Sequence, residues 1–198
     1  MPELILASAS AVRHQMLVAA GVEVDVRPVP VDEEGLRAAL AEEGASPRDM
    51  ADALAEAKAL RCSRKYPPGL VLGCDQILEF HGKALGKPKS RDEARQQLCD
   101  LRGQTHTLWS AAVLYRDARP IWRHIGEARL TMRHFTDTYL DGYLDRNWPL
   151  VGGSVGGYRI EEEGIRLFSA VTGDHFTILG LPLIPLLLYL NDQGAIAA

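Results

Sequence analysis

The stretch VLGCDQILEFHGKALGK, residues Val71 to Lys87, decides the fold that this sequence predicts. Its first residues are apolar enough for a buried strand, and that strand is expected to end at Asp75. His81 and Gly82 then predict a hairpin turn that returns Lys87 toward the same end of the strand. Because open α/β sheets bind ligands at the carboxyl ends of their strands, Asp75 is a candidate functional residue. A buried carboxylate also needs a partner, such as a metal ion, a lysine or a water.

The composition fits one folded domain covering residues 1–198. Hydrophobic residues make up 46% of the chain and charged residues 24%, which is typical of soluble globular proteins. The net charge of −4 argues against a nucleic acid polymer as the partner. Three cysteines without C-x-x-C spacing favour a reducing compartment. We expect a cytoplasmic protein with no membrane partner, because the apolar run at residues 176–190 is short and broken by prolines.

Local signals divide the rest of the chain into alternating elements. Expected strands cover residues 3–7, 22–29, 71–75, 105–115 and 121–133, and expected helices cover residues 11–20, 33–44, 47–64, 91–101, 137–146 and 182–190. The two strands beyond residue 104 should pair antiparallel across a loop at residues 116–120, slightly longer than a tight turn. The last helix is expected to be well buried. The glycine-rich segment at residues 151–164 indicates a backbone that turns sharply or closely approaches a ligand.

Several charged residues are candidates for binding an anion. Ser8 and Arg13 flank a helix start, where backbone N–H groups, hydroxyls and a guanidinium can converge on an anion. A capped surface helix with a solvated arginine explains the same residues. Taken alone, Glu33 and Lys58 are typical of solvated charges. Lys87 could present its positive charge to a phosphate oxygen.

The assembled motifs resemble the Maf nucleoside triphosphate pyrophosphatases, in family order along nearly the whole chain. The matching motifs are LILASAS with Arg13, VDE at 31–33, AEAKA with Lys58, GCDQ at 73–76, GKP at 86–88, RGQTH at 102–106, VGGYRIE at 155–161 and GDHFTILGLPL at 173–183. The resemblance implies an α/β fold with two lobes around a mixed, twisted sheet and a central cleft, often as a homodimer. It also implies a house-cleaning hydrolase that converts a nucleoside triphosphate to the monophosphate and pyrophosphate, with Mg²⁺ or Mn²⁺.

The resemblance also implies a role for each matching residue. Asp75 would orient or deprotonate the attacking water, directly or through the metal, and Glu33 would help Asp75 to bind that metal. The phosphates would be held by Ser8, Arg13, Lys58 and Lys87. Such a set is chemically reasonable, because a triphosphate carries nearly four negative charges that cations must neutralise before attack at phosphorus.

Two positions bear on the substrate. Gln76 follows the acid, and Glu161 ends the glycine-rich motif, as in the branch of the family that prefers 7-methyl-GTP. A carboxylate can accept hydrogen bonds from a guanine and favours the positive charge of a methylated one. Glu161 could instead be one of three consecutive surface acids. A preference for dTTP or UTP remains the alternative substrate.

The first motif departs from the family, which usually continues it with Pro-Arg-Arg. Ala11 and Val12 replace the proline and the first arginine here, so that Arg13 is the only arginine of the motif. This loss favours a second hypothesis, a non-catalytic nucleotide-binding regulator of cell division. A transferase acting on a nucleotide or sugar phosphate is a third, since β-α-β openings with anion loops also serve that chemistry.

Overall fold

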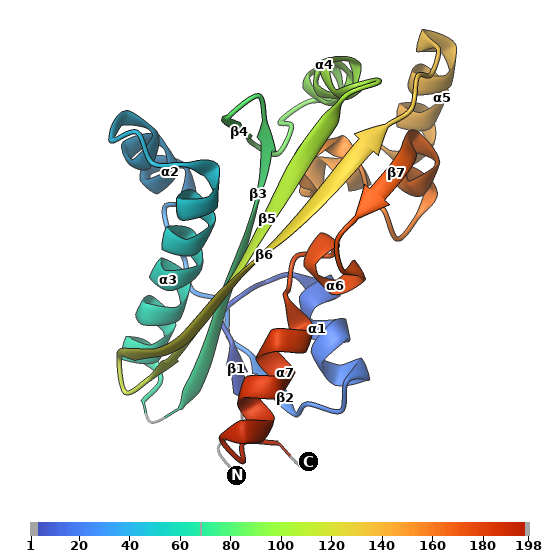
Figure 1. Ribbon diagram of the computed structural model, residues 1–198. Coiled ribbons are helices and arrows are strands. Elements are labelled where there is room, and N and C mark those ends of the chain that lie inside the picture. Colours follow the sequence, from blue (N-terminus) through green and yellow to red (C-terminus); the bar gives the residue numbers. More distant parts are fainter. Residues whose placement is uncertain (1–3, 68, 197–198) are drawn as a thin grey trace.

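The computed structural model describes residues 4–67 and 69–196 (Figure 1). The strands are β1 (Leu4–Leu6), β2 (Val24–Val26), β3 (Leu70–Phe80), β4 (Lys83–Leu85), β5 (Thr105–Arg116), β6 (Arg119–Met132) and β7 (Phe168–Thr172). The helices are α1 (Ala11–Ala19), α2 (Glu33–Glu42), α3 (Pro47–Lys65), α4 (Arg91–Leu101), α5 (Asp137–Asn147), α6 (His175–Ile178) and α7 (Leu183–Asp192). Three short 3₁₀ helices lie between α5 and β7, namely η1 (Leu150–Gly153), η2 (Val155–Gly157) and η3 (Glu163–Leu167).

The strands form one mixed sheet in the order β2-β1-β3-β5-β6-β7, with β4 paired to β3. The three strands β2, β1 and β3 run parallel, and the remaining pairs are antiparallel. The long strands β3, β5 and β6 run the length of the molecule and twist along the way (Figure 1). This arrangement confirms the predicted α/β fold around a mixed, twisted sheet. Within the described residues, no helix has the length and apolarity needed to cross a membrane.

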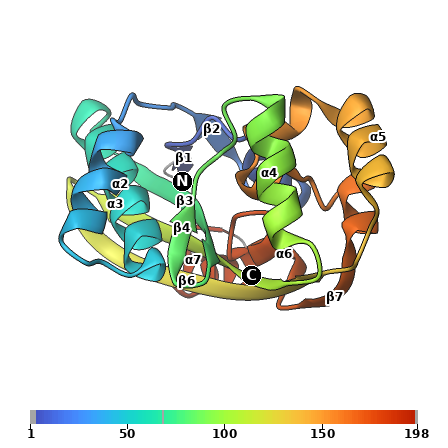
Figure 2. The same ribbon diagram turned by 90° about the horizontal axis from the view of Figure 1, so that it is seen from above.

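Helices cover both faces of the sheet in its β1-containing half. One face packs against α3, through the cluster that includes Leu54, Ala55 and Val71. The opposite face packs against α1 and α7, through the cluster that includes Leu17 and Leu186. In Figure 2, α2 and α3 stand on one side of the molecule, and α4 and α5 on the other. The β1-containing half of the sheet, together with α1, α3 and α7, forms the first lobe.

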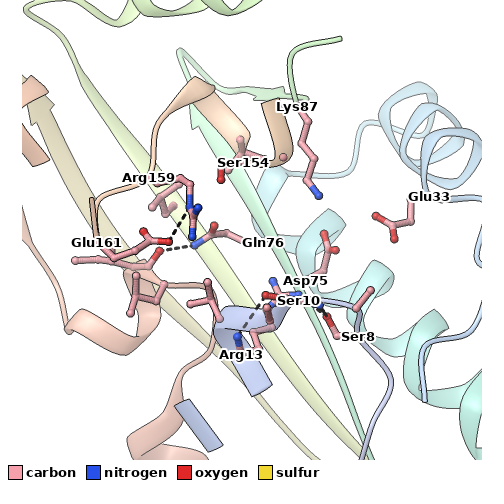
Figure 3. Close-up of a pocket in the computed structure, with 18 of the residues that line it drawn as sticks. Ser8, Ser10, Arg13, Glu33, Asp75, Gln76, Lys87, Ser154, Arg159 and Glu161 are labelled. Carbon is pink, nitrogen blue, oxygen red and sulfur yellow. Dashed lines mark hydrogen bonds and ion pairs between the residues drawn. The ribbon is translucent and has the colours of Figure 1, made fainter. Parts of the chain in front are cut away.

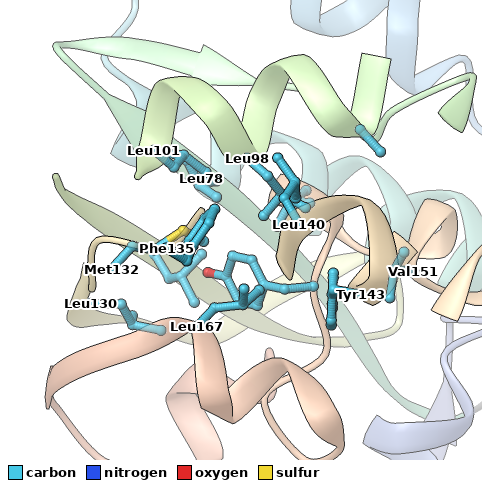
Figure 4. Close-up of a cluster of buried hydrophobic side chains, with 14 of the residues drawn as sticks. Leu78, Leu98, Leu101, Leu130, Met132, Phe135, Leu140, Tyr143, Val151 and Leu167 are labelled. Carbon is cyan, nitrogen blue, oxygen red and sulfur yellow. The ribbon is translucent and has the colours of Figure 1, made fainter. Parts of the chain in front are cut away.

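The other lobe encloses the far ends of the long strands. Figure 4 shows its buried cluster, in which Tyr143 of α5 packs among Leu78, Leu98 and Leu140. Tyr143 is fully buried, and its hydroxyl donates to the carbonyl of Gly157 at 3.5 Å. Burial raises the pKa of Tyr143 and keeps its hydroxyl protonated. The glycine-rich segment is thus fixed to this core and forms one wall of the second lobe.

The local signals for the helix starts are confirmed. Five of the expected helices begin at the predicted residues 11, 33, 47, 91 and 137, and in each the side chain of the preceding residue accepts the backbone N–H three residues further on; these caps are Ser10, Asp32, Ser46, Ser90 and Thr136. The expected burial of the last helix is only half right, because Ile184 and Leu188 of α7 lie on its exposed face. An N-cap is a contact within one turn, whereas the burial of a helix depends on distant partners.

The predicted loop at residues 116–120 is wrong. Arg116 pairs with Arg119, so β5 and β6 are joined by a turn of only two residues. Both of these residues, Asp117 and Ala118, have positive φ angles of 51° and 57°, the conformation of a tight hairpin turn. The sequence does not predict this turn because alanine is uncommon at the positive-φ positions of a tight hairpin turn. The Ser63 hydroxyl on α3 accepts the Ala118 N–H at 3.0 Å and helps to hold it.

Asp75 does not end its strand, contrary to the sequence prediction. β3 continues to Phe80 because its whole length pairs with β5. On its other edge, β3 pairs with β1 at residues 70–72 and with β4 at residues 78–80. Among the described residues, no strand covers the intervening edge at 73–77. Asp75 therefore lies beside an opening within the sheet, just beyond the carboxyl end of β1, where parallel strands place their ligands.

Gly73 determines how closely α3 approaches this opening. A Cβ atom at residue 73 would lie 2.1 Å from the Ala55 carbonyl oxygen and 2.7 Å from the Ala59 nitrogen, both on α3. Backbone atoms cannot yield as the end of a side chain can. The absence of a side chain at this position thus allows the backbone of α3 to pack directly on β3.

We expect Gly73→Ala to destabilise the protein by about 1–3 kcal/mol or more, because α3 must move away from β3. Urea unfolding followed by circular dichroism measures the change. Gly153→Ala is the matched control, since a Cβ at that glycine meets nothing within 4 Å. Equal stabilities of Gly73→Ala and the control would contradict the proposed packing constraint.

Candidate active site

A cavity of about 500 Å³ lies beside the open edge of β3. All the residues assigned from the sequence motifs line it, namely Ser8, Arg13, Glu33, Lys58, Asp75, Gln76, Lys87 and Glu161. Figure 3 shows Lys87 and Glu33 on one side, Glu161 on the other, and Asp75 between them. Its volume suits a small molecule of nucleotide size. The structure therefore brings the predicted residues together, from segments spread over most of the chain.

Three charged side chains form an ion cluster at one side of the cavity. Lys58 on α3 places its Nζ 2.6 Å from Oδ1 of Asp75 and 2.9 Å from Oε1 of Glu33. Lys58 and Asp75 are both buried, and Glu33 at the start of α2 is more exposed. The close approach of α3 at Gly73 sets this geometry, since Lys58 lies beside Ala59 on the same helix. Glu33 and Lys58 are not solvated charges, the interpretation that each residue alone had favoured.

The two carboxylates of this cluster are held differently. Burial alone would raise the pKa of Glu33, but the hydrogen bond and charge of Lys58, with the charges of Lys87 and Arg37, lower it below 4.5. Glu33 is thus ionised at neutral pH. The second oxygen of Asp75, Oδ2, is buried and has no hydrogen-bond partner among the described residues. A buried carboxylate oxygen without a partner is an acceptor available to a ligand, a metal ion or a water.

Arg13 is buried at the floor of the cavity and is not the solvated arginine of the alternative interpretation. Its Nε donates to the Gly180 carbonyl at 2.7 Å, and its Nη1 donates to the Ser8 hydroxyl and the Cys74 carbonyl, both at 3.1 Å. No carboxylate of the described residues forms an ion pair with Arg13. A buried cation balanced only by neutral oxygens is suited to receive an anion.

The GDHFTILGLPL motif at residues 173–183 holds this floor in place. Asp174 caps α6 by accepting the backbone N–H groups of Phe176 and Thr177. α6 packs on β6 at Gly126, where a Cβ would come within 2.6 Å of the Thr177 hydroxyl. Gly180 then turns the chain with a φ of +98° and presents its carbonyl to Arg13. The motif thus links the sheet to α1.

Gln76 is oriented by the same motif at residues 173–183. Its side-chain nitrogen donates to the Ile178 carbonyl at 2.9 Å and to the Ser110 hydroxyl at 3.0 Å. Because a carbonyl can only accept, the amide nitrogen must face α6. Successive residues of a strand point to opposite faces, so Asp75 faces α3 and Gln76 faces α6. The oxygen of Gln76 makes no hydrogen bond within the described residues.

Glu161 differs from its two acidic neighbours. It lines the cavity, whereas Glu162 and Glu163 do not. Its Oε1 accepts from Nε of Arg159 at 3.1 Å, and Nη1 of the same arginine lies 2.9 Å from Oε1 of Glu162. Arg159 therefore fixes the orientation of Glu161 beside Gln76 (Figure 3). This placement disfavours the interpretation of Glu161 as an ordinary surface acid.

The apolar wall next to Glu161 depends on a buried histidine. Nε2 of His106 lies 2.7 Å from the hydroxyl of Tyr158, which lines the cavity. Burial lowers the pKa of His106 to about 4, so the ring is neutral at physiological pH. Phe168 packs against both rings. This cluster supports a wall of Leu108, Val155, Tyr158 and Ile160.

Residues 3–193 match the family described as Maf-like protein. This chain belongs to the Maf family. The nucleoside triphosphate pyrophosphatase of Ruegeria sp. (strain TM1040) is 51% identical, over 98% of this chain and 97% of its own length. The 7-methyl-GTP pyrophosphatase of Mesorhizobium japonicum (strain LMG 29417 / CECT 9101 / MAFF 303099) is 48% identical, over 98% of each chain. A HAM1 protein from Coxiella burnetii aligns at 16% identity with a TM-score of 0.42, covering 67% of this chain and 73% of its own.

Two charged cavity residues of this Maf chain were not assigned from the sequence. Arg37 follows Glu33 by one helical turn, and this spacing could have indicated that both side chains lie on the same face of α2. Arg159 stands inside the VGGYRIE motif, but nothing in the motif pairs it with Glu161. With these two, five cationic side chains and three carboxylates line the cavity, in a protein whose net charge is −4.

The donors near Lys58 fit a magnesium-type ion in part. No group of three His, Cys, Asp or Glu residues that could hold a metal exists in the described residues. Mg²⁺ commonly binds one or two carboxylates and completes its shell with water and substrate phosphates. Asp75 and Glu33 provide such a pair, and Oδ2 of Asp75 has an unused acceptor position. The site therefore suits a metal that arrives with a phosphorylated substrate.

We expect Lys58→Met to destabilise this Maf protein by about 3–5 kcal/mol at neutral pH, because Asp75 would remain buried without its partner. The part of this loss that involves Glu33, whose pKa is lowered in the folded state, should be present above pH 4.5 and disappear as the pH falls. Urea unfolding across a pH series measures both effects. Lys83→Met, which removes an exposed lysine of β4, is the control. A Lys58→Met protein as stable as this control would contradict the structural role.

Proposed function

We propose that this Maf protein hydrolyses a nucleoside triphosphate to the nucleoside monophosphate and pyrophosphate. One observation carries the proposal, namely that the cavity has two chemically different ends with Asp75 between them. Figure 3 shows Lys87 and Glu33 on one side of Asp75 and Glu161 on the other, and the residues just before Glu161 in the chain add Tyr158 and Ile160 to the cavity lining. A polyphosphate suits the first end and a nucleobase suits the second. The names of the relatives support the same activity.

In this mechanism, Asp75 acts on the attacking water. Its Oδ1 is held by Lys58, which leaves the buried Oδ2 to accept a proton from the water. The water oxygen forms a bond to phosphorus as the anhydride bond between the α- and β-phosphates breaks, and the electron pair leaves with pyrophosphate. Arg13, Ser8 and Lys87 would bind the phosphate oxygens. Glu33 and Asp75 would hold Mg²⁺ or Mn²⁺, which would supply further charge neutralisation.

The base end supports a guanine-type substrate, with 7-methyl-GTP favoured. The fixed carboxylate of Glu161 can accept from a guanine edge and is attracted to a positively charged methylated ring. Gln76 offers a further acceptor through its side-chain oxygen. Two relatives named 7-methyl-GTP pyrophosphatase, at 48% and 43% identity, are consistent with this choice. The alternative remains a preference for dTTP or UTP.

Pyrophosphate release from a panel of nucleoside triphosphates, with Mg²⁺ or Mn²⁺, tests the activity. We expect turnover by the wild type and a loss of at least about a hundredfold in kcat for Asp75→Asn, because the proton acceptor is removed. Absence of pyrophosphate from every nucleotide would favour the non-catalytic regulator. Full activity of Asp75→Asn would instead place the catalytic centre elsewhere.

A second experiment concerns the base. We expect 7-methyl-GTP or another purine triphosphate to exceed dTTP in kcat/KM, and Glu161→Gln to reduce the preference for 7-methyl-GTP about tenfold. Glu162→Gln is the matched control, since Glu162 contacts the same arginine without lining the cavity. A wild-type preference for dTTP or UTP would overturn the substrate assignment, and equal effects of the two variants would remove Glu161 from base recognition.

A further inference from the structure

Arg37 is a cavity cation that forms no hydrogen bond or ion pair within the described residues. It stands on α2 and lines the cavity beside Glu33 and Lys87. Its Nε is buried and has no hydrogen-bond partner, and its guanidinium forms no ion pair within the described residues. Glu33, one helical turn away, pairs with Lys58 instead. A buried donor without an acceptor is destabilising, so its retention indicates a ligand that supplies the acceptor.

A second cation lies next to Arg37. A Cβ atom at Gly86 would be 3.5 Å from Nη1 of Arg37, so the guanidinium rests against the backbone that leads directly to Lys87. The charges of both residues reach Glu33 and lower its pKa. Lys87 also forms no ion pair in the described part of the chain. Two neighbouring cations repel each other unless an anion lies between them.

The other cavity cations are already engaged. Lys58 is balanced by two carboxylates, and Arg159 by Glu161 and Glu162. Arg13 donates through Nε and Nη1 to oxygens of the protein. Arg37 and Lys87 are therefore the cavity cations that form neither an ion pair nor a hydrogen bond within the described residues, and Figure 3 shows Lys87 on the opposite side of Asp75 from Glu161.

We propose that Arg37, together with Lys87, binds the β- and γ-phosphates of the substrate and retains them as the departing pyrophosphate. The inference rests on the proposed function and names the part of the substrate that this end of the cavity recognises. When the bond between the α- and β-phosphates breaks, negative charge develops on the pyrophosphate side. A guanidinium can meet two phosphate oxygens at once through its planar fork, which a lysine cannot do.

If the β- and γ-phosphates bind at Arg37 and Lys87 and the rest of the nucleotide binds elsewhere in the cavity, the two products can be tested separately. Pyrophosphate and GMP are titrated separately into the protein in buffer with MgCl₂, and binding is measured by calorimetry. We expect Arg37→Ala to weaken pyrophosphate binding about tenfold to a hundredfold and to change GMP binding less than twofold. Arg37→Lys keeps the charge without the fork and should recover only part of the affinity. Lys87→Ala should share the selective loss.

Arg48→Ala is the matched control, because Arg48 is an exposed arginine near the start of α3 that does not line the cavity. Thermal unfolding of each variant verifies that it is folded, which is expected for Arg37→Ala since Arg37 forms no hydrogen bond or ion pair within the described residues. Pyrophosphate binding within twofold of wild type would overturn the inference. A parallel weakening of pyrophosphate and GMP would also overturn it, because Arg37 would then act on the whole cavity.

The outcome is distinguishable from a failure of the proposed function. Binding of pyrophosphate is measured without turnover, so a selective loss in Arg37→Ala supports the site even if no nucleotide in the panel is hydrolysed. Conversely, turnover by the wild type with unchanged pyrophosphate binding in Arg37→Ala would support the proposed activity and contradict the assignment of Arg37 to the β- and γ-phosphates.

Discussion

A buried carboxylate in the middle of a long strand is the constraint on which the rest of the structure depends. Asp75 is only 5% exposed, so a cation from a neighbouring element is needed to balance its charge. Gly73 permits this approach, because α3 can rest its backbone on the strand two residues earlier. Lys58 then reaches Asp75 and Glu33 together. One glycine on β3 thereby determines the positions of α3, α2 and the charged end of the cavity.

On the side of β3 that faces α1 and α6, the buried cation Arg13 is bound by neutral oxygens. Beyond β1, the strand has an open edge whose carbonyl groups need donors. Arg13 supplies one to Cys74 and is tied to Gly180, so that α1, β3 and the α6-α7 turn are linked through one guanidinium. Gln76 joins β3 to α6 in the same region. The contacts that close the sheet edge are thus also those that shape the cavity floor.

The sequence was sufficient for features set by local interactions. The starts of five helices and the hairpin at His81 depend on a few neighbouring residues, and the structure confirms them. The extension of β3 beyond Asp75 was missed because it depends on pairing with β5, whose partner residues lie 28–34 positions further along the chain. The tight turn at Ala118 was missed because a hydroxyl on α3 holds it. Tertiary partners decided each of these cases.

The site was predicted unevenly for a related reason. A family resemblance transfers residues that belong to shared motifs, and all eight of those residues line one cavity. It does not show how their charges are distributed among partners. Arg37 lies outside every motif, and the pairing of Arg159 with Glu161 is visible only in three dimensions. Which cations are neutralised and which are available is a property of contacts, and only the structure supplies it.

The distribution of charge also limits the kind of ligand that this protein can bind. A net charge of −4 disfavours the binding of a long polyanion, yet the cavity is lined by more cations than carboxylates. Only a polyanion short enough to enter the cavity can gain from that local field. The apolar wall supported by His106 and Tyr158 rewards a ligand that also carries a flat ring. A single nucleotide with its phosphates combines both properties, whereas an inorganic polyphosphate lacks the ring.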